Sequence, residues 1–75
     1  MKVLGYAHKH LTFQDGRSCD GTFLYLSEER NDVTGVATER VFLSDAKADG
    51  YKPALGDELK LYYNRFGKLD AVELR

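Results

Sequence analysis

The residues best suited to hold a metal ion lie near the start of the chain, in His8-Lys9-His10 and in Cys19-Asp20. On a β-strand His8 and His10 point to the same face, because successive side chains alternate between the two faces. Zinc accepts imidazole, thiolate and carboxylate ligands, and a structural zinc site needs four of them. These residues follow no recognised zinc-binding spacing. We therefore expect both histidines to face solvent, and we expect no metal site and no cofactor.

Nucleophilic or acid–base catalysis has equally little support in the sequence. Cys19, the only cysteine, lies in the turn-like segment 15–21, and nothing around it predicts an oxyanion hole. Glu28 and Glu29 are adjacent, so on a strand their carboxylates point to opposite faces. A chain of 75 residues also has little volume in which to enclose a substrate pocket. We expect a binding protein and not an enzyme.

Aromatic side chains beside cationic ones form the pattern that best suits a ligand. Phe66 lies between Arg65 and Lys68 in a turn, and Tyr62 shares its strand face with charged and polar residues. An exposed ring can stack on a nucleobase while a neighbouring cation neutralises a phosphate. The same ring can instead fold back onto the domain or form a protein contact. Both interpretations stay open on the sequence.

These side chains must be positioned by β-strands. Glycines and a single proline separate short segments rich in Val, Phe, Tyr, Thr and Leu, a composition typical of strands. The segment 58–64 alternates most clearly, and Gly67 can adopt the positive φ of a hairpin turn. Ser44 can cap a short helical turn after the third strand, and Gly50 can end that turn. We expect five strands, over residues 2–10, 22–27, 35–43, 58–64 and 69–74.

The predicted fold class is all-β, with residues 1–75 forming one domain. Five strands with a short turn or helix between the third and fourth are typical of a small antiparallel barrel of the oligonucleotide/oligosaccharide-binding (OB) type. An SH3-like barrel and an open sheet packed on a second subunit are the alternatives. We expect Phe23, Phe42 and Tyr63 to face the core, since alternation points them inward with Leu or Val neighbours.

The charge of the chain is nearly balanced but unevenly placed. The formal net charge is −1, with a net of +2 over residues 1–18 and −3 over residues 19–32. Nucleic-acid-binding domains are commonly much more basic. No apolar run approaches the length of about 20 residues that a membrane span needs, and one cysteine allows no internal disulfide. We expect a cytoplasmic protein that does not insert into a membrane.

One part of the sequence resembles a known family. Residues 51–57, 59–63 and 65–69, with Phe66-Gly67 in the turn, resemble the C-terminal half of the single-stranded DNA-binding proteins of filamentous phages. The resemblance implies an OB-type barrel that dimerises and coats single-stranded DNA cooperatively during replication. It also implies that Phe66 and Arg17 contact DNA, with Tyr25 as the corresponding aromatic residue of the following strand.

The sequence leads to two functional hypotheses. The first is a homodimeric, non-catalytic binder of single-stranded nucleic acid, with single-stranded DNA favoured, from a phage or another mobile element. The second is a protein–protein interaction module or assembly subunit with the same barrel, in which the exposed rings are interface anchors. Under the first hypothesis the nucleic-acid-binding residues are Arg17, Tyr25, Arg40, Tyr62, Arg65, Phe66 and Lys68.

Overall fold

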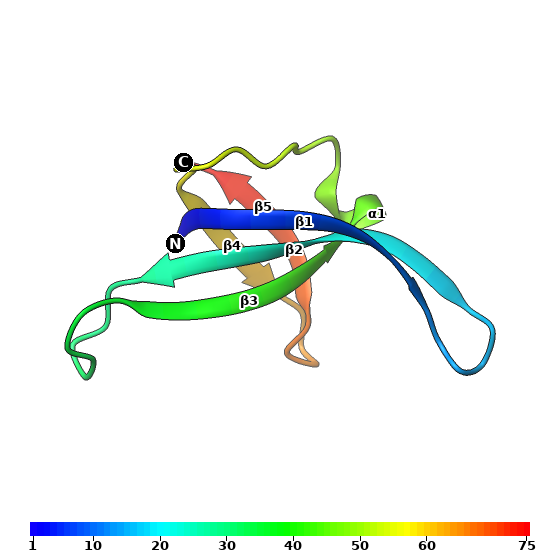
Figure 1. Ribbon diagram of the computed structural model, residues 1–75, viewed down its shortest axis with the longest axis horizontal. Helices are drawn as coiled ribbons and strands as arrows, with labels where there is room; N and C mark the ends of the chain where they lie inside the picture. Colours follow the sequence, from blue (N-terminus) through cyan, green and yellow to red (C-terminus); the bar gives the residue numbers. More distant parts are fainter.

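The computed structural model describes all 75 residues, and its strands form two antiparallel sheets (Figure 1). The first sheet has the order β1-β2-β3 and the second contains β4 and β5. The elements are β1 (Lys2–Thr12), β2 (Ser18–Glu28), β3 (Ala37–Ser44), α1 (Asp45–Ala48), β4 (Leu59–Tyr63) and β5 (Leu69–Leu74). The predicted all-β class is therefore confirmed.

β1 and β2 are longer than the sequence predicts and form a hairpin that projects from the body of the molecule (Figure 1). Their pairing continues as far as Thr12 opposite Ser18. The turn is closed by the backbone N–H of Phe13, which donates to the Arg17 carbonyl at 2.8 Å. Gly16 takes a φ of 87° in this turn, a conformation that favours glycine.

The predicted helical turn is present as α1. The Ser44 hydroxyl oxygen accepts a hydrogen bond from the Lys47 backbone N–H at 3.3 Å, as an N-cap does. The helix ends at Ala48, and the two residues after it, Asp49 and Gly50, have left-handed φ values of 50° and 83°. α1 is four residues long, and no helix of the molecule has the length and apolar character needed to cross a membrane.

The core lies between the two sheets and is small. Its buried members are aliphatic, and most come from one face of the three-stranded sheet: Val3, Leu24, Leu26, Val41, Leu43 and Leu59. Phe23 and Phe42, predicted to face the core, alternate with these residues and lie on the opposite face of the sheet. The prediction was wrong because β2 and β3 carry apolar residues on both of their faces. Alternation alone therefore does not identify which face is the inner one.

Tyr63 is also outside the buried core, with 48% of its surface exposed. A register shift between Tyr62 and Tyr63 interrupts the pairing of β4 with β5. The extra residue is Asp70 on β5, so the alternation of Leu59 and Leu61 along β4 continues to Tyr63. Tyr63 is exposed because it lines an open cavity between β3 and β5 and not the buried cluster.

The two sheets are joined by hydrogen bonds at one edge. The Leu59 backbone N–H donates to the Met1 carbonyl at 2.7 Å, and that of Val3 donates to the Asp57 carbonyl at 2.9 Å. At the other edge β3 and β5 are in contact, but no ladder pairs them. The closed five-stranded barrel predicted from the sequence is therefore not confirmed. We call the open junction of β3 and β5 the seam.

Candidate functional site

The face of the three-stranded sheet that points away from the core carries three aromatic rings and three cations. We call it the outer face. Paired residues of neighbouring strands share a face, which defines its members. They are Lys2, Gly5, Ala7, Lys9 and Leu11 from β1, Cys19, Gly21, Phe23, Tyr25 and Ser27 from β2, and Thr38, Arg40, Phe42 and Ser44 from β3. None of these side chains is a carboxylate.

The rings of the outer face form a contiguous group. The centroids of Phe23 and Phe42 are 5.0 Å apart, with the ring planes tilted by 60°. Tyr25 is the next outward-pointing residue of β2 and pairs with Arg40 across the sheet. The rings are not coplanar, and each offers its own apolar face on which a planar group can stack.

Arg40 is a cation in direct contact with these rings. Its guanidinium carbon lies 5.0 Å from the centroid of Phe23, within the range of a cation–π contact. No carboxylate lies within ion-pair distance of Arg40 or of Lys9. Glu39, the neighbour of Arg40 in β3, pairs with Leu26 and so belongs to the inner face. The outer face is therefore locally positive although the chain as a whole is not.

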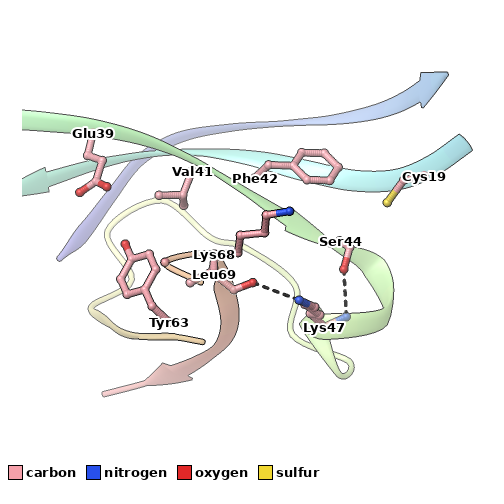
Figure 2. Close-up of a pocket in the computed structure, with 10 residues that line it drawn as sticks. Cys19, Glu39, Val41, Phe42, Ser44, Lys47, Tyr63, Lys68 and Leu69 are labelled. Carbon is pink, nitrogen blue, oxygen red and sulfur yellow. Dashed lines mark hydrogen bonds between the residues drawn. The ribbon is translucent and has the colours of Figure 1, made fainter. Parts of the chain in front are cut away.

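The seam holds a cavity of about 490 Å³ that begins where the outer face ends (Figure 2). Phe42 lines it from β3, and Leu69 lines it from β5. Two lysines also line it. The Lys47 ammonium is held 3.4 Å from the Asp70 carboxylate and 3.5 Å from the Leu69 carbonyl. Lys68 has no ion-pair partner, and Figure 2 shows its side chain extending toward β3 near Phe42.

Tyr63 forms part of the opposite wall of this cavity. Burial raises the pKa of the Tyr63 hydroxyl, and the negative charges of Glu39 and Glu28 raise it further. These carboxylates therefore act on the inner side of the seam. The lining of the cavity therefore carries one carboxylate, that of Glu39, as well as the two lysines.

The structure brings some of the sequence-predicted residues together and separates others. Tyr25 and Arg40 are direct cross-strand neighbours on the outer face. Arg17 lies in the β1–β2 turn, where its Nε is 2.6 Å from a carboxylate oxygen of Asp15. The charge of Arg17 is thus already balanced within the turn, and this residue is apart from the aromatic group.

The other four predicted residues belong to the β4–β5 hairpin. Tyr62 donates its hydroxyl to Glu73 at 2.5 Å and has the Lys60 ammonium 5.2 Å from its ring centroid, so its polar groups are engaged locally. Phe66 is 72% exposed at the tip, with the Arg65 guanidinium 5.0 Å from its ring. Lys68 follows at the mouth of the seam. This hairpin is a second cationic and aromatic element beside the outer face.

Sequence reasoning missed Phe23, Phe42 and Lys9 as members of the site. Phe42 and Arg40 occur two residues apart and so share a strand face, a signal that the sequence contains. Gly21 gives a second signal, because a glycine inside a strand often marks a close approach by another group. What the sequence lacks is the register that places Phe23 beside Phe42.

The two histidines lie at the exposed end of the inner face. His8 Nε2 is 3.1 Å from a carboxylate oxygen of Asp45, and His10 Nδ1 is 2.6 Å from one of Asp20. Both rings are more than half exposed, so the prediction that they face solvent is confirmed. The molecule contains no group of three or more His, Cys, Asp or Glu side chains arranged to hold a metal ion.

Comparisons of this chain with protein-family models, with curated proteins and with solved structures found no match. The site is therefore interpreted from its own chemistry. Its components are a contiguous aromatic group, unpaired cations on a face without carboxylates, and an adjoining lysine-lined cavity.

Proposed function

We propose that this chain is a non-catalytic binder of single-stranded nucleic acid, with single-stranded DNA favoured, and that the outer face is its main contact surface. The observation that carries the proposal is the contact between Phe23 and Phe42 on a face with cations and no carboxylate. Stacking of bases on such rings contributes about 1–3 kcal/mol per base and tolerates any sequence. Arg40 and Lys9 supply the charge that phosphates require.

The β4–β5 hairpin extends this surface. Phe42 belongs both to the outer face and to the lining of the seam, where Lys68 also lies. A strand whose base stacks on Phe42 can therefore place a neighbouring phosphate near the Lys68 ammonium. Arg65 and Phe66 at the hairpin tip offer one further cation and ring to the same strand.

We further propose that the fold is an OB-type barrel that is open at the seam. The hydrogen-bonded contact of β1 with β4, together with the contact between β3 and β5, supports a ring of five strands. OB folds bind oligonucleotides through the face of their second and third strands and through the loops after the first and fourth. Here those parts carry Tyr25 with Arg40, then Arg17, and then residues 65–68. This correspondence supports the likeness to filamentous-phage DNA-binding proteins.

The exposed surface supports a homodimer. A compact monomer of this mass exposes about 4,700 Å², whereas this chain of 8.5 kDa exposes 5655 Å². The excess of roughly 1,000 Å² is comparable to the area of about 800 Å² that each partner buries in a standard interface. Leu4 and Leu74 are exposed apolar residues that such an interface could bury.

A protein-interaction module is the second candidate. It is favoured by the net charge of −1 and by the 72% exposure of Phe66, which suits an interface anchor. The salt dependence of binding distinguishes the two functions. Binding through phosphate contacts weakens steeply as the salt concentration rises, whereas binding through an apolar interface does not.

Nuclear magnetic resonance with ¹⁵N-labelled protein tests where the ligand binds. Titration with oligo-dT should shift the amide signals of Phe23, Tyr25, Arg40 and Phe42 in a saturable way, together with those of residues 65–68. Shifts confined to other surfaces, or no shifts at low salt, would contradict the proposal. Retention of the remaining signals serves as the control for an intact fold.

A further inference from the structure

A second cavity lies on the inner face of the three-stranded sheet, on the opposite side from the aromatic group of the outer face. Its volume is about 430 Å³, and its walls come from β1, from α1 and from the segment 50–53. Cavities of about 300–1,000 Å³ are typical of sites for small molecules. The proposed function makes no use of this cavity.

Two tyrosines form its aromatic walls. Tyr51 is held in place because its hydroxyl donates to an Asp57 carboxylate oxygen at 2.8 Å, and the same oxygen accepts the Ala54 backbone N–H at 3.1 Å. Burial raises the pKa of the Tyr51 hydroxyl, and the hydrogen bond to Asp57 raises it further, so this anchor keeps its proton. Tyr6 projects from β1 with 49% of its surface exposed. Tyr6 lies on the inner face of the sheet, but β4 and β5 do not cover it.

Polar and charged groups complete the rim. His8 Nε2 is within 3.2 Å of both carboxylate oxygens of Asp45, and each of these side chains is more than half exposed. The pair therefore presents an imidazole and a carboxylate to the cavity mouth, a hydrogen-bonding edge of both polarities. Lys52 lies on the rim without an ion-pair partner. A ligand that matches all three features is planar, has donors and acceptors along one edge, and carries an anion.

We propose that this cavity binds one nucleotide, with its base against Tyr6 and Tyr51, its base edge at the His8–Asp45 pair and its phosphate at Lys52. Tyrosine rings supply the stacking surface for the base, and the Lys52 ammonium supplies the charge for the phosphate. The nucleotide is either a free nucleoside monophosphate or the phosphorylated end of a strand, since both have the same chemistry.

The test is a titration of ¹⁵N-labelled protein with each of the four common ribonucleoside 5′-monophosphates. We expect saturable shifts at Tyr6, Thr22 and residues 48–53 for at least one of them. Tyr6→Ala should weaken nucleotide binding about tenfold or more, which corresponds to a loss of about 1.4 kcal/mol of binding free energy. Lys52→Gln should weaken the binding of the nucleotide but not that of the corresponding nucleoside, which has no phosphate. Phe13→Ala, which removes an equally exposed aromatic ring in the β1–β2 turn, should have no effect.

Two results would overturn the inference. One is the absence of saturable shifts at millimolar nucleotide, and the other is shifts confined to Phe23, Tyr25 and Phe42. The second result would leave the proposed function standing, so the two proposals fail separately. Competition by a 5′-phosphorylated oligonucleotide would assign the cavity to a strand end, whereas nucleotide binding that the oligonucleotide does not displace would assign it to a free nucleotide. Lys52→Gln replaces an exposed side chain, so it remains informative if Tyr6→Ala impairs folding.

Discussion

The ring of Phe42 lies directly over Gly21, in the space that any side chain at position 21 would occupy. A Cβ atom placed on Gly21 would lie 2.3 Å from Cζ of Phe42 and 2.7 Å from the carbonyl oxygen of Leu43. Phe42 in turn contacts Phe23. The absence of a side chain at Gly21 therefore sets the position of the aromatic group on the outer face.

Gly21→Ala should displace Phe42 and disturb the adjoining backbone. We expect a loss of stability of about 1–3 kcal/mol, the usual effect of an added methyl group without space, together with weaker oligonucleotide binding. Urea unfolding measures the first effect and fluorescence anisotropy the second. Gly5→Ala is the matched control, because its Cβ would lie at an ordinary 3.9 Å from Tyr25. Equal effects of the two substitutions would contradict this role of Gly21.

Removing either ring of the Phe23–Phe42 contact should weaken oligo-dT binding more than it weakens the fold. Both rings are only partly buried, and leucine retains most of their apolar volume. We expect Phe23→Leu and Phe42→Leu each to lower affinity by about 5- to 150-fold, which corresponds to about 1–3 kcal/mol per stacked base. Leu55→Ala removes an apolar side chain that is 69% exposed outside the outer face and serves as the control. Unchanged affinity in both leucine variants would refute the stacking role.

The two arginines should differ in their effect on salt dependence. Each phosphate contact with a single strand contributes a slope of about −0.7 to a plot of log Kobs against log salt concentration. Arg40→Gln should make the slope shallower by about that amount, because Arg40 has no carboxylate partner. Arg17→Gln should change it less, because Asp15 already compensates the Arg17 charge. The reverse order would show that the β1–β2 turn is the main phosphate contact.

The sequence predicts the elements of this fold better than it predicts their faces. The β5 strand and the Ser44-capped turn are found where expected, because local features such as Gly67 and the Ser44 hydroxyl determine them. The inner face of β2 is different. Phe23 and Leu24 are both apolar neighbours in one strand, and only the packing of Leu24 against the second sheet decides which one is buried.

For the candidate site too, local sequence predicts some residues, whereas the geometry depends on packing. Tyr25 and Arg40 are predicted from their residue types, and the structure pairs them across β2 and β3. The engagement of Arg17 by Asp15 could be anticipated, since the two residues are close in sequence, but its geometry depends on the closed turn. The seam cavity beside Lys68 depends on how two sheets pack, and no local pattern in the sequence encodes that packing.

The small core makes stability sensitive to single aliphatic residues. Leu24 is fully buried, and Leu24→Ala should cost about 2–5 kcal/mol, a large part of the 5–15 kcal/mol that holds a typical domain folded. Leu4→Ala should cost far less, because Leu4 is 52% exposed. Thermal unfolding followed by circular dichroism compares the two variants. A similar loss in both would contradict the assigned core.

Tyr51 should couple stability to alkaline pH. Burial and Asp57 raise the pKa of Tyr51 above its ordinary value of 10.0, so above pH 10 the unfolded chain loses a proton that the native state retains. Stability should therefore fall as pH rises from that point. Tyr51→Phe should flatten this fall while removing one hydrogen bond worth about 1 kcal/mol at neutral pH. Urea unfolding at several pH values measures both effects, and an unchanged pH dependence in Tyr51→Phe would contradict the coupling.

The central claim is that single-stranded nucleic acid binds the outer face, and the fluorescence anisotropy of labelled oligo-dT tests it most directly. The wild-type protein is compared with a variant that combines Phe23→Leu and Phe42→Leu. Both are titrated at about 50 and 200 mM salt, a range over which phosphate contacts weaken measurably. We predict micromolar or tighter binding of the wild type that weakens steeply with salt and is largely lost in the variant. No binding at the lower salt, or equal binding by the two proteins, would contradict the assignment of the outer face to single-stranded nucleic acid.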